Sequence, residues 1–146
     1  MHTTRRFKGR AALAALCGVV LAATLSTTQA QADPAPGGWT KSDPNSPTAQ
    51  EITQWAATRL NATSNSAYLN AVTQRVDLQT QVVAGTVYRT EFIWAPTNCL
   101  KNSGTPEEEC SVIPGAPQEL CIAKIYDRPW EHSRELTEFE CNRINS

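Results

Sequence analysis

The hydrophobic period of the sequence changes once, from a helical to a strand-like spacing, near residue 65. Upstream of the change, apolar side chains recur on one helical face: Ile52, Trp55, Ala56 and Leu60. This spacing predicts an amphipathic helix of about four turns that ends close to the change. Ser46 can cap this helix with Pro47 in its first position. A capping box of Thr48 and Glu51 lies further along, and both starts remain open.

Downstream of the change, apolar and polar residues alternate in segments that we expect to be β-strands: 72–79, 86–94, 120–126 and 135–141. In the first segment, Val72, Val76 and Leu78 are expected to share one largely apolar face. Gly85 marks the first hairpin turn, and residues 96–117, with several Pro, Gly and Glu, are expected to form a loop. One helix followed by an antiparallel meander indicates the α+β class. We expect one long helix packed across a twisted antiparallel sheet of about four to five strands.

The start of the chain has the order of residues found in a secretory signal peptide. A basic segment, 5–10, precedes an apolar run over 11–25, and Ala30-Gln31-Ala32 fits the cleavage pattern. The apolar run is about 15 residues long, short of the roughly 20 that span a bilayer. We therefore expect residues 1–32 to be a signal peptide and residues 33–146 to be one secreted, extracellular domain.

Removal of those 32 residues from the 146 would leave 114 residues with nine basic and 14 acidic side chains, a net charge of −5. That length supports a single hydrophobic core. The acidic balance, without a cluster of Lys and Arg, argues against nucleic acid and anionic membranes as partners. Residues 33–47, rich in Pro, Gly, Asp and Ser, are expected to form an extended, mobile arm ahead of the helix.

Cleavage after residue 32 also removes one of the five cysteines, Cys17, and leaves an even number. Four cysteines in a short secreted chain predict two disulfides, with three possible pairings. We favour the sequential pairing, Cys99–Cys110 and Cys121–Cys141, because each bond then closes a compact loop or hairpin. We expect neither a metal nor another cofactor, since no C-x-x-C pair occurs and the domain offers only His132 as a nitrogen ligand.

Three features are unusual for the places that they occupy. Gly37-Gly38 lies on the arm, the apolar pair Val82-Val83 lies at the tip of the first hairpin, and Pro129-Trp130 lies in the turn of the second. Loop tips normally face water and are polar. An exposed Trp beside an exposed pair of valines therefore indicates a surface that a partner covers.

Taken together, these features resemble the cystatin family. Gln81 to Gly85 is similar to the cystatin signature Gln-x-Val-x-Gly, and Pro129-Trp130 is similar to the Pro-Trp of its second hairpin. Gly37 is similar to the N-terminal Gly of the family. The four cysteines fall where secreted, type-2-like cystatins have theirs, and the pairing that this implies is also the sequential one. The resemblance covers essentially the whole domain 33–146 and implies the cystatin fold.

The resemblance implies a reversible, tight-binding competitive inhibitor of papain-like cysteine proteases such as cathepsins L, S, B or C. Cystatins fill the active-site cleft with a wedge made of the N-terminal arm and two hairpin tips. The residues that would form this wedge are Gly37, Gln81, Val82, Val83, Ala84, Gly85, Pro129 and Trp130. Gly37 would let the arm bend, the first tip would cover the catalytic Cys and His of the protease, and Trp130 would pack on the primed side.

Two further sites and one departure complete the comparison with the family pattern. Ser64-Asn65-Ser66 resembles the Ser-Asn-Asp loop with which some type-2 cystatins inhibit legumain, and Asn65 would be the residue offered. Ser66 replaces the Asp, and an ordinary turn is the alternative interpretation. Asn61-Ala62-Thr63 is a glycosylation sequon. Ala35 and Pro36 depart from the family, which often has larger apolar residues before the Gly.

Two other classes of function compete with inhibition. A Cys-His hydrolase needs a free thiolate and a nearby base, and four paired cysteines with one histidine supply neither, so we do not expect an enzyme. The remaining alternative is a cystatin fold used as a secreted binding or structural module without inhibitory activity. We expect a monomer, although the first hairpin could open at Gln81 to Gly85 and pair between chains as a domain-swapped dimer.

Overall fold

The computed structural model describes residues 37–144 of the chain. The predicted signal peptide, residues 1–32, and the arm residues Ala35 and Pro36 lie outside the described residues. Within the described part, no helix is long and apolar enough to cross a membrane.

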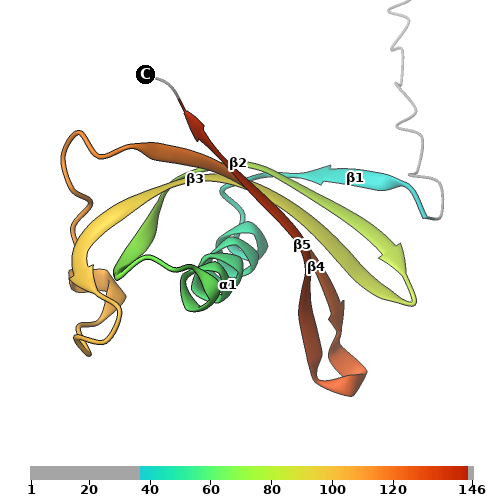
Figure 1. Cartoon of the computed structure of the whole chain (residues 1–146). Coiled ribbons are helices and arrows are strands. Elements are labelled where there is room, and N and C mark those ends of the chain that lie inside the picture. The colour runs from blue at the N-terminus through green and yellow to red at the C-terminus, as the bar shows by residue number, and fades with distance from the viewer. Residues whose placement is uncertain (1–36, 145–146) are drawn as a thin grey trace, which may run out of the picture. The chain divides into compact units, whose positions relative to one another are not determined.

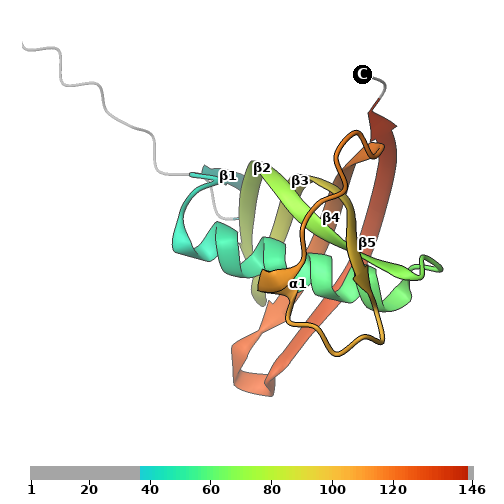
Figure 2. The same ribbon diagram turned by 90° about the vertical axis from the view of Figure 1, so that its left-hand side faces the viewer.

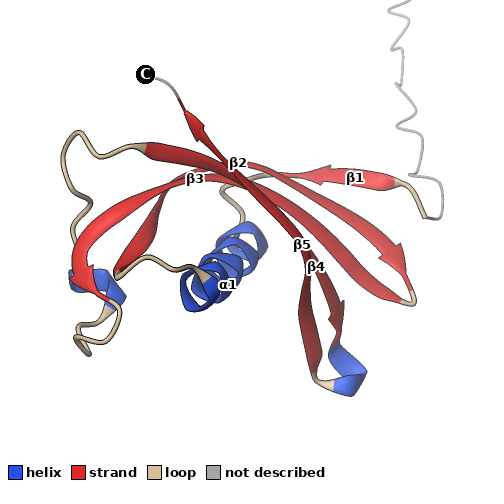
Figure 3. Cartoon of the chain, viewed as in Figure 1, coloured by secondary structure: helices blue, strands red, loops and turns tan. Residues whose placement is uncertain are grey.

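Over residues 37–144, five antiparallel strands form one sheet and one α-helix crosses a face of it (Figure 1; Figure 2; Figure 3). The helix and strands are β1 (Trp39–Ser42), α1 (Pro47–Thr63), β2 (Tyr68–Val83), β3 (Gly85–Leu100), β4 (Gln118–Arg128) and β5 (Ser133–Ile144). Two short 3-10 turns, η1 (Glu107–Glu109) and η2 (Pro129–Glu131), follow β3 and β4. The strands lie in the order β1-β2-β3-β4-β5, so each pairs with the next. The predicted α+β fold is confirmed.

The first turn of α1 distinguishes between the two candidate starts of the helix. Ser46 is the N-cap, because its side chain accepts a hydrogen bond of 3.2 Å from the backbone N–H of Ala49. Pro47 follows as the first helical residue, where its missing N–H costs nothing. Glu51 does not close a capping box and instead forms an ion pair of 2.8 Å with Arg134 of β5.

The core lies between α1 and the face of the sheet that the helix covers. Its buried residues are Ile52, Ala56, Ala57 and Leu60 of α1, Leu78 of β2, Phe92 and Trp94 of β3, and Cys121, Ala123 and Ile125 of β4. A hydrogen bond of 2.8 Å between the hydroxyls of Thr53 and Thr90 joins the helix to β3 inside this layer. Because this packing holds α1 against the middle of the sheet, the ends of both hairpins project beyond the helix (Figure 1).

Two predictions about connecting segments are wrong. Residues Trp39–Ser42, predicted to belong to a mobile arm, form β1 and pair with residues 78–81 of β2. The predicted loop 96–117 begins five residues too early, since β3 continues to Leu100. The end of β3 is held on one side by Tyr68 of β2 and on the other by a bridge between Thr97 and Val112. Sheet pairing therefore orders backbone that has no alternating pattern of its own.

Strand β2 departs from strict alternation of its side chains. Its pairing with β3 shifts register between Val72 and Gln74 and again between Arg75 and Asp77. Each shift places an extra residue in β2, and the side chains beyond it change face. Val72 and Leu78 therefore pack in the core layer, whereas Val76 is exposed. The predicted common face of these three residues is wrong at Val76.

Two disulfides connect the C-terminal half of the described chain. Cys99–Cys110 joins the end of β3 to the segment that follows η1. Cys121–Cys141 joins residues that are directly paired in β4 and β5. This connectivity is the sequential one, and it leaves no free thiol among the described residues.

Asn61, the residue of the glycosylation sequon, has its side chain engaged within the fold. Its side chain is buried, with 4% of its surface exposed. Its Nδ2 donates a hydrogen bond of 2.8 Å to the carbonyl of Asn70, and its Oδ1 accepts one of 2.9 Å from the Asn70 N–H. A sugar on Nδ2 would compete with the hydrogen bond from this nitrogen to the carbonyl of Asn70, so these contacts disfavour a glycan at Asn61 without testing it. The amide instead fastens the end of α1 to β2.

Candidate functional site

The tip of the first hairpin depends on a glycine. β2 ends at Val83 and β3 begins at Gly85, so Ala84 alone makes the turn. Gly85 has φ +120°, a conformation that residues with a side chain rarely adopt. A Cβ at this position would lie 2.7 Å from the carbonyl oxygen of Asp127 in β4 and 2.9 Å from the ring of Tyr126. The tip therefore lies directly against β4, with Val82 and Val83 exposed to solvent.

The first described residue of the arm lies beside this tip. The side-chain amide of Gln81 donates a hydrogen bond to the carbonyl of Gly37, and Trp39 is the partner of Gln81 in the β1–β2 pairing. Gly37 has φ +82°, so the chain bends here in a way that favours glycine. The arm thus reaches the sheet next to the Gln81–Gly85 tip.

The tip of the second hairpin presents one large aromatic side chain. The turn η2 joins β4 to β5, and the N–H of His132 donates a bond of 3.1 Å to the carbonyl of Pro129. His132 has φ +49°, which lets the chain reverse into β5. Trp130 stays 63% exposed at the point of the turn. A large apolar side chain in this position is typical of a contact that a partner buries.

The arm and the two tips lie at the same end of the sheet. Thr86, next to the first tip, pairs with Asp127, and the hydroxyl of Tyr126 donates a hydrogen bond to the carbonyl of Ala84. The ends of both hairpins and the start of β1 lie on the same side of α1 in Figure 1. We call this set the binding edge, and its residues are Gly37, Gln81, Val82, Val83, Ala84, Gly85, Pro129 and Trp130.

The binding edge offers surface to a partner and no reactive group. Its side chains are apolar or amide, and its residues include no carboxylate, amine, imidazole or thiol. Catalysis by proton transfer or nucleophilic attack requires such a group within reach of the substrate. The edge is therefore suited to recognition by burial and backbone hydrogen bonds.

The second hairpin is anchored to α1 by ion pairs made close to its turn. Arg134 of β5 bridges Asp127 of β4 and Glu51 of α1, with nitrogen–oxygen distances of 2.8 Å to each. The hydrogen bond to Asp127 is the main cause that raises the pKa of Arg134 above its ordinary value, ahead of the opposing effect of burial. The guanidinium also lies 5.9 Å from the ring centroid of Trp55 in α1. These contacts set the direction in which the hairpin leaves the sheet.

Sequence reasoning missed two residues that join the tips, Tyr126 and Arg128. Tyr126 bonds to Ala84 of the first tip, and Arg128 forms ion pairs within the second hairpin. The sequence does contain a signal for these two residues, because the alternation along β4 places both on one face just before Pro129. Their partners lie outside β4, in the first tip, in η2 and in β5, and the alternation along β4 does not identify them.

Asn65 lies away from the binding edge, in the connection between α1 and β2. This connection leads into Tyr68 at the start of β2, whereas the first tip follows Val83 at the other end of that strand (Figure 1). Asn65 itself is exposed. The Nζ of Lys101 donates bonds of 2.7 Å to the backbone and side-chain oxygens of Ser64, and the hydroxyl of Ser66 contacts the backbone of Tyr68. The loop is thus fixed on both sides of Asn65.

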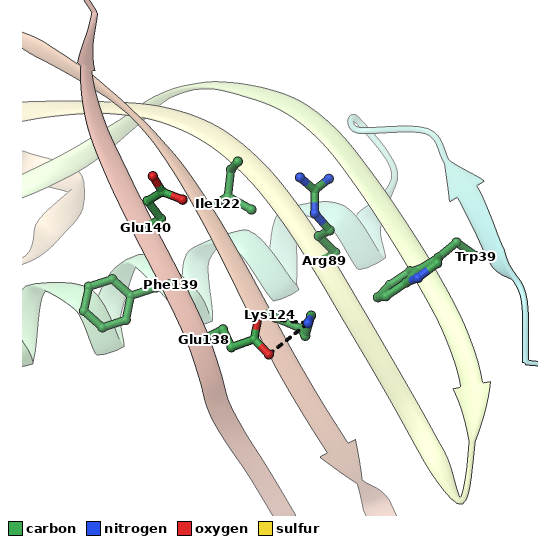
Figure 4. Close-up of a pocket in the computed structure, with 7 residues that line it drawn as sticks. All are labelled: Trp39, Arg89, Ile122, Lys124, Glu138, Phe139 and Glu140. Atoms are coloured by element: carbon green, nitrogen blue, oxygen red, sulfur yellow. Dashed lines mark hydrogen bonds and ion pairs between the residues drawn. The ribbon is translucent and has the colours of Figure 1, made fainter.

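A shallow hollow on the outer face of the sheet offers no comparable site (Figure 4). Trp39 and Ile122 contribute its apolar lining. Of its charged groups, Lys124 pairs with Glu138 at 2.9 Å and Arg89 pairs with Glu91, while Glu140 accepts a hydrogen bond of 2.9 Å from the side-chain amide of Asn142. Because these partners satisfy each other, the hollow has no set of free charges that would select a small ligand.

Comparisons with known proteins agree with this architecture. A family model described as the cystatin domain matches residues 37–130, from the arm glycine to the aromatic residue of the second tip. A cystatin of Notechis scutatus scutatus is 34% identical over 114 residues, which cover 73% of this chain and 81% of that protein. Cystatin-1 of Chilobrachys guangxiensis is 30% identical over 112 residues, 75% of this chain and 84% of that protein.

Solved structures give the same result. The crystal structure of Al-CPI superposes with a TM-score of 0.68 and 34% sequence identity, over 74% of this chain and 100% of that one. Both the matched domain and the relatives extend over more than half of the chain. The chain belongs to the cystatin family, whose members inhibit cysteine proteases.

Proposed function

We propose that this protein is a reversible, tight-binding competitive inhibitor of papain-like cysteine proteases. Its binding edge would occupy the active-site cleft of the protease and keep substrates out. The observation that supports this most is the continuity of the edge. Gln81 contacts Gly37, and Tyr126 connects Ala84 to the strand that leads into Pro129-Trp130. Three segments far apart in the sequence therefore act as one surface with a fixed spacing.

Each part of the edge has its own task in this proposal. The bend at Gly37 directs Ala35 and Pro36 into the non-primed subsites of the cleft. The first tip, Gln81 to Gly85, covers the catalytic Cys and His of the protease. Trp130 packs on the primed side, and no peptide bond is presented to the nucleophile.

The physical basis of tight binding is rigidity together with exposed apolar area. Val82, Val83 and Trp130 are exposed in the free protein and leave water when a cleft encloses them. Both tips are ends of paired strands, so little conformational entropy is lost on binding. The small residues Ala35 and Pro36 provide less area on the non-primed side than larger apolar residues would.

The proposal also covers where the protein acts and which proteases it binds. Residues 1–32 act as a signal peptide, and the mature domain is a secreted monomer that acts outside the cell. The partners are proteases of the cathepsin L, S, B or C type. A domain-swapped dimer, formed by opening of the hairpin at Gln81 to Gly85, would lose the first tip and with it this activity.

Titration of papain tests the proposal against the alternative of a non-inhibitory secreted module. The protein is produced in a secreting host and added to papain whose active sites have been counted. We expect inhibition at a ratio of one to one, relieved by increasing peptide substrate, with the inhibitor chain intact by mass spectrometry after long incubation. Full papain activity at micromolar inhibitor would contradict the proposal and favour the non-inhibitory module.

We further propose a second inhibitory site for legumain at Asn65. The observation in its favour is that Asn65 is exposed while Ser64 and Ser66 on either side are hydrogen-bonded to Lys101 and Tyr68. A protease that cleaves after Asn requires an accessible Asn, and a fixed loop resists the deformation that cleavage needs.

Replacing Asn65 by Lys is expected to abolish inhibition of legumain, because the side chain offered to the protease is lost. Inhibition of papain by the same variant is expected to stay unchanged, since the binding edge lies at the other end of the sheet. Both inhibition constants are measured from progress curves. Wild-type protein that leaves legumain active, or a variant that inhibits it as well as wild type does, would show that this loop is an ordinary turn.

A further inference from the structure

Arg128 lies between the two tips and contacts parts of both. Its Nη1 is 2.7 Å from a carboxylate oxygen of Glu131, inside η2, and its Nη2 is 2.9 Å from Glu135 in β5. The same Nη2 donates a bond of 3.2 Å to the hydroxyl of Ser133. The guanidinium thus spans the turn that carries Trp130, from the strand before it to the strand after it.

The other face of the guanidinium is turned to the first tip. Its central carbon lies 5.1 Å from the ring centroid of Tyr126, which is a cation–π distance. The hydroxyl of Tyr126 bonds to Ala84, and the Arg128 stem lies 3.3 Å from where a Cβ on Gly85 would be. A continuous path of contacts therefore leads from Ala84 through Tyr126 and Arg128 to Glu131.

Strand pairing holds the base of the turn, where Arg128 faces Ser133, and the described contacts of the turn beyond that pairing are few. Pro129 has no N–H, and the turn closes through the single bond from His132 to the Pro129 carbonyl. Trp130 is mostly exposed, so core packing does not fix it. Nε of Arg128 is buried without a hydrogen-bond partner among the described residues, which costs free energy. The contacts of the guanidinium with Glu131, Glu135 and the ring of Tyr126 offset this cost.

From these contacts we infer that Arg128 is a positioning residue for the binding edge, one that immobilises the Pro129-Trp130 turn relative to the first tip. Its effect on protease binding is indirect, because it acts through Trp130. A turn that is ordered before binding does not have to be ordered on binding, so affinity is gained without any added contact. The inference depends on the proposed function only where inhibition is measured.

Arg134 provides a matched control on the opposite face of the same hairpin. Both arginines bridge two carboxylates, and their side chains are almost equally exposed, 26% for Arg128 and 25% for Arg134. Arg134 connects the hairpin to α1, whereas Arg128 spans the turn. Replacing either by Met removes one charge and keeps a long apolar stem.

The first measurement needs no protease. Nitrogen-15 relaxation reports the order parameter of the Trp130 indole N–H, which is assigned from its absence in Trp130→Ala. Values of about 0.85 indicate a rigid group and values below about 0.6 a flexible one. We expect a rigid indole in wild type and in Arg134→Met, a flexible one in Arg128→Met, and an intermediate value in Arg128→Lys, whose ammonium reaches one carboxylate.

The second measurement is inhibition of papain by the same variants. We expect Arg128→Met to raise the inhibition constant about tenfold, the cost of ordering one or two side chains on binding. In a Trp130→Ala background the same substitution is expected to change the constant less than about threefold, because Arg128 acts through Trp130. Glu131→Gln combined with Glu135→Gln, which leaves Arg128 in place, is expected to reproduce the Arg128→Met result.

Several outcomes would overturn the inference. These are an indole that is flexible in wild type, an indole that stays rigid in Arg128→Met, and equal effects of Arg128→Met and Arg134→Met. Full additivity with Trp130→Ala would also overturn it, since Arg128 would then contact the protease directly. If wild type did not inhibit papain, the proposed function would fail, while the relaxation data would still decide whether Arg128 immobilises the turn.

Discussion

An alanine at position 85 is expected to raise the inhibition constant for papain about 100-fold, a loss of roughly 2.7 kcal/mol. The reason lies inside the protein, where the new Cβ would lie 2.7 Å from a backbone oxygen of Asp127 and 2.9 Å from the ring of Tyr126. A backbone oxygen in a paired strand cannot move aside, so the first tip must move away from β4. The spacing between the tips then no longer matches the cleft.

The same substitution also strains the backbone, because φ at Gly85 is +120°. We expect the free energy of unfolding to fall by about 1–3 kcal/mol. Gly104→Ala is the control, since Gly104 also has a positive φ, +71°, with no atom near its absent side chain. That variant should lose stability and keep its inhibition constant. Urea unfolding and papain progress curves on both variants check this, and inhibition by Gly85→Ala within about threefold of wild type would contradict it.

The resemblance alone suggests a different reason for a glycine here, namely that a side chain would collide with the protease. The structure adds a collision inside the inhibitor. The two reasons predict different results for stability, because a collision with the protease would leave the free protein unaffected. The unfolding measurement on Gly85→Ala therefore separates them.

The elements that could be predicted from the sequence are those with a local pattern. The helical spacing of Ile52, Ala56 and Leu60 gave the position of α1, and the alternation over residues 86–94 gave the position of β3. In both cases the type of element follows from the burial of one face, and the buried residues recur at a fixed, short spacing in the sequence.

Elements that exist through pairing alone could not be predicted. Trp39–Ser42 has no alternation, and it is a strand because β2 offers a free edge at residues 78–81. The shifts of register in β2 are likewise invisible in its sequence, since alternation continues through Val76 although the pairing does not. Long-range pairing overrides the local pattern in both places.

The candidate binding edge likewise has one part that the sequence predicts and one part that it does not. Its exposed residues carried a signal, because Val82, Val83 and Trp130 are apolar where loop tips are usually polar. The contacts that hold the edge together carried none, since Tyr126 and Ala84 are 42 residues apart in the chain. Motifs can thus identify what meets a partner, while the rigidity of the surface is a property of the folded protein.

Replacing Trp130 by Ala is expected to raise the inhibition constant for papain at least about 30-fold, which corresponds to about 2 kcal/mol. The side chain is 63% exposed in the free protein, so its burial removes on the order of 100–150 Å² from water. At about 25 cal/mol per Å² this area gives roughly 2–4 kcal/mol before losses. Stability is expected to stay within about 0.5 kcal/mol of wild type, because an exposed side chain contributes little to folding.

Phe139→Ala is the matched control for that result. Phe139 is another large aromatic on the same hairpin, 56% exposed, but it pairs with Ala123 in the middle of β5, away from the tip. If exposed aromatic area alone governed inhibition, both substitutions would weaken it. We expect Phe139→Ala to leave the inhibition constant unchanged and Trp130→Ala to act mainly by speeding dissociation, as hot-spot losses usually do. If Trp130→Ala and wild type had equal inhibition constants for papain, the second hairpin would not be part of the interface, because no other residue of that turn has comparable apolar area to bury.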